Sequence, residues 1–234
     1  MESKNFDFPG VIERMQLKRS KYVLIPNFSL LGEVYRSLLN RKHQIILECG
    51  VNRGLSTSIF TYYCENSASY CFSIDIKDCS DVVTSDSWTF IKNDDSNVSE
   101  IIKDYPILDQ KGIDILFIDS LHTANHVKKV LYNWYPYLNK DSLVFIDDID
   151  SANYRKGNRK DNLVIELNLD EINEFTRDFV QQNYHDTSLT HYYGKTGLAR
   201  ISKISEKGSK PEPINKRVRY IKVGLVGNRI FLLS

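Results

Sequence analysis

The sequence lacks the features that would place the chain in a membrane or on a polyanion. No run of residues approaches the ~20 apolar residues that a membrane-spanning helix requires, and the N-terminus "MESKNFDFPG" carries charge without an apolar segment. The formal net charge is only +1, so the composition does not demand nucleic acid or an anionic lipid surface as a partner. We therefore expect a cytosolic (cytoplasmic) protein without a membrane partner.

Cysteine is scarce and unevenly placed. The chain has four cysteines, Cys49, Cys64, Cys71 and Cys79, and none in the remaining two-thirds of the sequence. No pair has the CxxC spacing of a metal site, and the distribution does not suit a disulfide framework. We expect reduced, mostly buried thiols. No internal repeat is visible.

Apolar runs of strand length alternate with segments of helical period. Runs at 43–49, 69–75, 113–119 and 142–148 are rich in Ile, Leu, Val and Phe, which is typical of strands buried on both faces. Between and after them, 124–138 and 168–183 have apolar residues three or four apart, and Asn168 with Glu171 resembles a capping box. Strands connected by helices predict a doubly wound, mostly parallel α/β sheet.

The length and the 41% hydrophobic content predict a single domain across residues 1–234. Residues 1–40 are expected to form an N-terminal helical cap, because 27–39 is amphipathic, and 41–203 the core. Segments 189–203 and 217–234 read as strands, the latter a hairpin around "VGNR", so antiparallel strands are expected at the C-terminal end, with 204–234 as a strand extension.

Two glycines stand where the first core strand gives way to a helix, in "ILECGVNRGLSTSIF" (46–60). In a doubly wound sheet, this turn offers backbone N–H groups to a ligand, and glycine permits close approach. Gly50 and Gly54 do not match the dinucleotide pattern, because Asn52 stands where a pyrophosphate site requires glycine. An ordinary tight turn explains the two glycines alone about as well.

Acidic residues after the next strands favour a nucleoside ligand. Asp75 ends the second strand, where a carboxylate can accept hydrogen bonds from both ribose hydroxyls. Asp95 and Ser96, in the loop "NDDSN", are candidate contacts for an adenine edge. For Asp75 the alternative is a solvent-facing or turn-capping aspartate, and for the loop a polar connection without a ligand.

These motifs resemble those of class I S-adenosylmethionine-dependent methyltransferases, which have a Rossmann-like fold. The first motif is E-x-G-x-x-x-G-x-S, made here by Glu48, Gly50, Gly54 and Ser56, and "FSIDI" resembles the second. The segment "DILFIDSLHTANHVKKVLYNWYPYLNKDSLVFIDDID" resembles the metal-dependent small-molecule O-methyltransferases of the catechol and macrolide-sugar types. The resemblance covers residues 27 to about 203. It implies that the residues of the first motif and Asp119 contribute to the cofactor site.

Carboxylates also end the later strands. Asp119 follows one core strand and Asp147 and Asp148 end the next, so all three should meet at the edge of the sheet that carries the glycine turn. Like charges this close require a cation, and oxygen ligands suit Mg²⁺ or a similar divalent ion. The alternative is that Asp147 and Asp148 only end a strand and open a loop.

The resemblance implies a base three residues after Asp119, where this chain has His122. The chain departs from the pattern at Leu121, where the sugar-type enzymes carry an acidic base, and at Ser120, where glycine is usual. His126 lies one helical turn beyond His122 and could join it and Asp119 around zinc, but a surface position beside a lysine is favoured.

We therefore predict a Mg²⁺-assisted O-methyltransferase that acts on a hydroxylated small molecule such as a sugar, a natural product or a catechol. Asp119 and His122 are the expected catalytic residues, and Asp119, Asp147 and Asp148 the metal ligands. The alternatives are a metal-independent methyltransferase acting on nitrogen or RNA, a non-catalytic S-adenosylmethionine-binding module, and an NAD(P)-linked enzyme, which Asn52 disfavours.

Two basic stretches bear on which partner the chain binds. Residues 154–162 follow the aspartate pair and suit a lid that contacts an anionic substrate, while 203–222 holds seven Lys or Arg against two Glu. A solvated hairpin edge explains the second stretch better than nucleic acid, because no RNA-binding motif accompanies it. Relatives of this kind often associate, so a homo-oligomer stays open.

Overall fold

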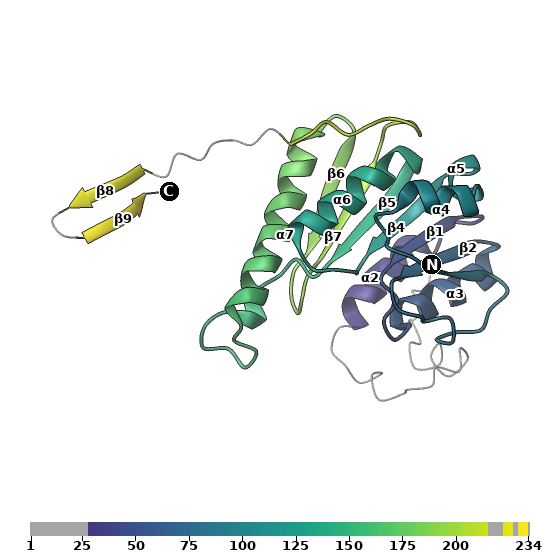
Figure 1. The fold of residues 1–234 in the computed structure, drawn as a ribbon, viewed down its shortest axis with the longest axis horizontal. Coiled ribbons are helices and arrows are strands. Elements are labelled where there is room, and N and C mark those ends of the chain that lie inside the picture. The colour runs from purple at the N-terminus through teal and green to yellow at the C-terminus, as the bar shows by residue number, and fades with distance from the viewer. Residues whose placement is uncertain (1–27, 215–221, 227–228, 234) are drawn as a thin grey trace.

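The computed structural model describes residues 28–214, 222–226 and 229–233, with side chains described for 30–214 only. Its centre is a seven-stranded sheet with the strand order β3-β2-β1-β4-β5-β7-β6 (Figure 1). The five strands β1 (Ile45–Cys49), β2 (Tyr70–Asp75), β3 (Trp88–Lys92), β4 (Ile113–Ile118) and β5 (Leu138–Asp147) are mutually parallel. The predicted doubly wound, mostly parallel sheet is confirmed.

The C-terminal strands of the sheet run antiparallel, as predicted. β7 (Leu198–Lys203) pairs with β5, and β6 (Thr187–Tyr192) pairs with β7 at the sheet edge. A separate antiparallel hairpin joins β8 (Lys222–Val226) and β9 (Arg229–Leu233). Residues 1–27 of the predicted N-terminal cap and residues 215–221 of the basic 203–222 stretch lie outside the described residues.

Helices cover both faces of the sheet (Figure 1). One face packs against α4 (Val98–Asp104), α5 (Ile107–Gln110), α6 (Ala124–Trp134) and α7 (Leu163–Gln182), and the other against α2 (Phe28–Leu38) and α3 (Leu55–Ser67). Neighbouring residues of one strand alternate between these two cores: Ile46 faces the α2/α3 side while Leu47 faces the other. Both faces are apolar, which explains the unbroken hydrophobic runs in the strands.

Short 3₁₀ turns complete the connections at η2 (Tyr135–Tyr137) and η3 (Ala152–Tyr154). None of the helices in the described ranges is long and apolar enough to cross a membrane. All four cysteines are buried and free, as predicted.

One predicted boundary is wrong. The capping pattern placed the start of the last long helix at Asn168, but α7 begins at Leu163 and Asn162 is its N-cap. The Asn162 side chain accepts hydrogen bonds from the backbone N–H groups of Val164 and Ile165. The apolar period does not reveal this first turn, because Leu163, Val164 and Leu167 are exposed rather than packed on the sheet.

Candidate functional site

The turn between β1 and α3 requires glycine at both predicted positions. Gly50 has φ +96°, and a Cβ there would lie 2.1 Å from the carbonyl oxygen of Asp119. Gly54 has φ +75° and would place a Cβ 2.7 Å from the side chain of Val82. A side chain at either position would be strained and would collide with its neighbours, so the turn lies directly against the segment that follows β4.

Glu48 and Ser56, the other two residues of this motif, contact each other in the interior. The Glu48 carboxylate is fully buried and accepts hydrogen bonds from the hydroxyls of Ser56, Thr57 and Ser73. Burial raises the pKa of Glu48 to about 7, although the three hydroxyl donors oppose the shift. This network ties β1 to β2 and to the first turn of α3, behind the cavity described below.

Asp75 faces the glycine turn from the end of β2. Its Oδ2 accepts the backbone N–H groups of Val51 and Asn52 at 3.0 and 3.1 Å, and its Oδ1 accepts that of Lys77 at 2.9 Å. Partial burial works against ionisation, but these donors outweigh it and lower the pKa of Asp75. The carboxylate therefore stays charged and fixes the shape of the turn.

Asp95 and Ser96 follow β3 and point in different directions. The Ser96 hydroxyl donates to Asp94, so it is occupied within its own loop. Asp95 is buried, and its Oδ1 lies 2.9 Å from Nε2 of His126. This ion pair raises the pKa of His126, against the effect of burial, and Asp94 adds to the increase while Lys129 opposes it.

His126 was predicted to be a surface residue, and this is wrong. Only 16% of its side chain is exposed, and its Nε2 also lies 3.1 Å from the hydroxyl of Ser120. The chain gives no local signal of this contact, because Asp95 is distant in sequence and reaches α6 only in the folded sheet. His126 also lies outside the group of residues that could share a metal ion, so the zinc alternative finds no support within 28–214.

A cavity of about 480 Å³ opens at the carboxyl ends of β1, β2 and β4, a volume suited to a small-molecule ligand. Of the predicted cofactor residues, Gly50, Asp75, Asp95 and Asp119 line it, whereas Glu48, Gly54 and Ser56 support the turn from outside and Ser96 is not part of the lining. The other lining residues are Asn52, Ile74, Ile76, Lys77, Asn93, Asp94, Ser120, Leu121, His122 and His126.

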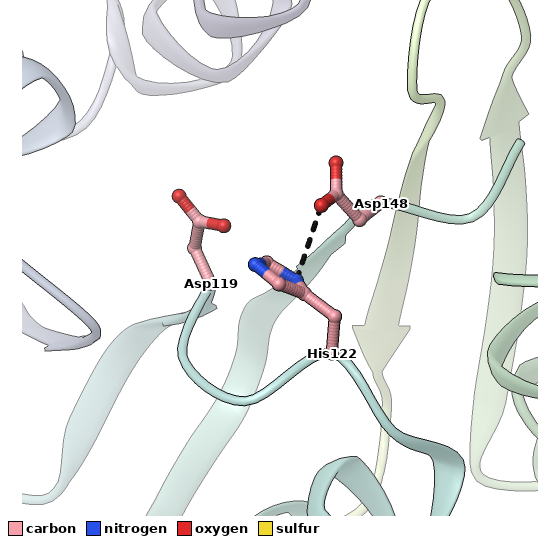
Figure 2. A group of neighbouring side chains, drawn as sticks. All are labelled: Asp119, His122 and Asp148. Atoms are coloured by element: carbon pink, nitrogen blue, oxygen red, sulfur yellow. Dashed lines mark ion pairs between the residues drawn. The ribbon is translucent and has the colours of Figure 1, made fainter. Parts of the chain in front are cut away.

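A second group of side chains adjoins this cavity. Asp119, His122 and Asp148 each offer one ligand atom, and these atoms all lie within 4.8 Å of one another. Figure 2 shows the three side chains converging from the end of β4, the following loop and the end of β5, with Nδ1 of His122 3.1 Å from Oδ2 of Asp148. His122 thus occupies the place in this group where Asp147 was expected.

Backbone geometry separates Asp147 from Asp148. Asp148 has φ +59°, and its N–H contacts both the carbonyl of Gly197 and Oδ1 of Asp147. Burial and the neighbouring Asp148 raise the pKa of Asp147 to about 7. Burial, followed by the charges of Asp147 and Asp148, also raises the pKa of Asp119 well above its ordinary value.

The carboxylates of this cluster fit a cation. In the part of the chain that the structure describes, neither Asp119 nor Asp147 forms an ion pair with lysine or arginine, and Asp148 pairs only with His122. Partly buried carboxylates without cationic partners repel one another and hold protons that a divalent ion would replace. The two carboxylates offer the hard oxygen ligands that such an ion prefers, and the imidazole lies beside them.

Comparison with known proteins finds a matching family model and several solved structures with a similar fold. Residues 47–149 match the family model described as a methyltransferase domain. A search of curated proteins finds no match. Among solved structures, the MycE methyltransferase of mycinamycin biosynthesis, in complex with Mg, SAH and mycinamycin VI, has a TM-score of 0.59 at 18% identity over 90% of this chain.

Two further structures are similar over most of their own length. One is a putative caffeoyl-CoA O-methyltransferase from Staphylococcus aureus, with a TM-score of 0.58 at 15% identity, covering 84% of this chain and 98% of that one. The other is CalS11, a TDP-rhamnose 3'-O-methyltransferase of calicheamicin biosynthesis, with a TM-score of 0.52 at 15% identity, covering 83% of this chain and 93% of that one. This chain spans only 58% of the length of MycE. The resemblance to class I methyltransferases is confirmed.

Proposed function

We propose that this chain, whose residues 47–149 carry a methyltransferase domain, transfers a methyl group from S-adenosylmethionine to an oxygen of a hydroxylated small molecule with the help of Mg²⁺ or a similar divalent cation. One observation carries the proposal: Asp119 lines the cavity beside the glycine turn and also belongs to the cluster with His122 and Asp148. The methyl donor and the acceptor would therefore meet at one residue.

The residues around the cavity suit an adenosyl ligand. Oδ1 of Asp75 accepts only the Lys77 N–H and keeps a spare lone pair for a ribose hydroxyl, whereas Oδ2 already accepts the N–H groups of Val51 and Asn52. Gly50 lets the turn pack directly against the Asp119 backbone and lines the cavity where the methionine end would lie. Asp95 offers a carboxylate oxygen to the base. Glu48, Gly54 and Ser56 act in this proposal by holding the turn in shape.

Asp119 and Asp148 would hold the cation, with Asp147 beside them. When bound, a divalent ion supplies charge that lowers the pKa of an acceptor hydroxyl and helps to align it. Asp119 and Asp148 orient the ion because each projects from the end of a rigid strand (Figure 2). Asp147 would stabilise the arrangement by accepting the Asp148 N–H.

His122 is the proposed base. Its side chain is 45% exposed, and Nδ1 faces Asp148 at 3.1 Å, so Nδ1–H donates to that carboxylate and Nε2 is left to accept a proton. Asp148 in this way fixes both the ring orientation and the tautomer. The acceptor oxygen loses its proton to His122 and attacks the methyl carbon in line with the departing sulfur.

The proposed acceptor is a small hydroxylated molecule, with 151–162 as a covering loop. Burial raises the pKa of Tyr154 in this loop, and the negative charge of the nearby Asp148 raises it further. The Lys160 ammonium lies over the Tyr154 ring. A cytosolic location belongs to the same proposal, and the four free cysteines suit a reducing compartment.

Calorimetric titration with S-adenosylhomocysteine, with and without Mg²⁺, followed by a turnover assay on a panel of hydroxylated compounds, tests the proposal. We expect EDTA to abolish turnover and Asp148→Asn to remove the response to Mg²⁺ while the nucleoside still binds. Asp141→Asn, an exposed carboxylate near the other end of β5, is the matched control. Turnover that survives EDTA would favour the metal-independent alternative, and binding without any methyl transfer would favour the non-catalytic module.

A further inference from the structure

Asp95 has a buried carboxylate oxygen that lacks a partner. Its side chain is only 6% exposed and lines the proposed cofactor cavity. Oδ1 contacts His126, but Oδ2 has no hydrogen-bond partner among the described residues. A buried carboxylate oxygen without a donor is unfavourable, so a ligand that brings an N–H or O–H group to this position would be selected.

Two contacts fix the direction in which Oδ2 points. Nε1 of Trp134 donates to the backbone carbonyl of Asp95 at 2.8 Å and anchors the loop to α6. Nε2 of His126, in the first turn of the same helix, holds Oδ1 at 2.9 Å. The backbone and one carboxylate oxygen are thereby tied to a single rigid helix, which leaves Oδ2 as the oxygen that can still accept a hydrogen bond.

The required ligand group is a hydrogen-bond donor. The exocyclic amino group of adenine supplies one, whereas a 6-oxo purine presents an acceptor that would face a carboxylate at the same place. A site built around a buried polar group discriminates strongly against a ligand that cannot complete its hydrogen bond.

We propose that His126 is a positioning residue of the cofactor site: by holding Oδ1 of Asp95, it directs Oδ2 to the base and so makes the site selective for an amino purine. This inference rests on the proposed function, because it takes the cavity ligand to be an adenosyl compound. Ser120, which replaces the usual glycine of the motif, completes the arrangement with its hydroxyl 3.1 Å from the same Nε2.

The test compares the affinity of the full chain for S-adenosylhomocysteine with that for its 6-oxo analogue, S-inosylhomocysteine, by calorimetry. We expect the natural chain to favour the adenosyl compound at least about tenfold. His126→Ala and His126→Asn should bring this ratio close to one, since neither side chain reaches Asp95. His126→Gln should keep most of it, because its amide nitrogen lies near the position of Nε2 and can donate.

The ratio of the two affinities distinguishes positioning by His126 from a merely structural role, because a structural role would weaken the binding of both ligands equally. His185→Ala changes an exposed histidine whose ring lies tilted against that of Tyr184; it is the control and should keep the natural ratio. An unchanged ratio in His126→Ala, or no preference in the natural chain, would overturn the inference while leaving the proposed function in place. Failure of the natural chain to bind S-adenosylhomocysteine would instead overturn the proposed function, and the inference with it.

Discussion

Gly50 belongs to the glycine motif of the sequence, and in the folded chain it lies directly against the Asp119 carbonyl. We expect Gly50→Ala to lower the free energy of unfolding by several kcal/mol, since the new Cβ would add a collision with the Asp119 carbonyl to the strain of a positive φ. Gly157→Ala is the matched control: φ there is +88°, but nothing lies within 4 Å, so only the conformational cost of about 1 kcal/mol is expected. Urea unfolding of the two variants measures the difference, and equal losses would contradict the packing explanation.

Glu48 should make the stability of the fold depend on pH. Its pKa is about 7 in the folded chain against 4.5 as the ordinary value, so the folded state holds a proton between these pH values that the unfolded state releases. The free energy of unfolding contributed by this group is therefore greatest below pH ~4.5 and falls as the pH rises through ~7, by up to about 3 kcal/mol. Glu48→Gln carries no titrating proton and should flatten this part of the profile.

Urea unfolding between about pH 4.5 and 8 in the presence of EDTA, which removes cations from the aspartate cluster, measures the effect of Glu48. The exposed Glu100→Gln is the control and should keep the natural profile. Asp119 and Asp147 also have raised pKa values. Only the difference between the stability profiles of the natural chain and of Glu48→Gln therefore reports on Glu48. Coincident profiles for the Glu48 variant and the natural chain would contradict the prediction.

At the scale of the element, α7 tests where the helix begins. Asn162→Ala removes the side chain that accepts the N–H groups of Val164 and Ile165, so a loss of about 1 kcal/mol of stability is expected. Asn168→Ala lies inside the helix and should be neutral or slightly stabilising, because alanine has the higher helix propensity. Thermal unfolding of both variants distinguishes the observed cap from the one that the sequence pattern favoured, and the opposite ranking would refute the observed boundary.

At the scale of the whole molecule, we propose that residues 41–203 work as one cofactor-binding core within a single domain, with 1–40 and 204–234 as additions. A ligand that binds only the folded state stabilises it, by ~2.7 kcal/mol at 100 times its dissociation constant. S-adenosylhomocysteine should therefore raise the melting temperature in a single transition, and Mg²⁺ should raise it further in the natural chain but not in Asp148→Asn. Two separate transitions, with only one shifted by the ligand, would contradict the single domain.

Much of the fold was predictable because its signals are local. Continuous apolar runs identified four of the five parallel strands, and helical period identified α6, since strands buried on both faces and helices packed on one side leave these patterns in the sequence. The runs did not identify β3, most of whose residues are only partly buried. The parallel topology then placed Gly50, Asp75 and Asp119 at one edge, where the structure has them around a single cavity. Their roles with a cofactor stay predictions.

The tertiary structure alone decided which side chains meet. The positive φ of Asp148 and its contact with Gly197 bring that carboxylate to His122, and no sequence pattern specifies this backbone conformation for an aspartate. His126 contacts Asp95 only because α6 and the loop after β3 lie beside each other in the folded sheet. Periodicity within the chain fixes where strands end and which residues stand there, whereas contacts between residues distant in sequence depend on how the strands and helices pack.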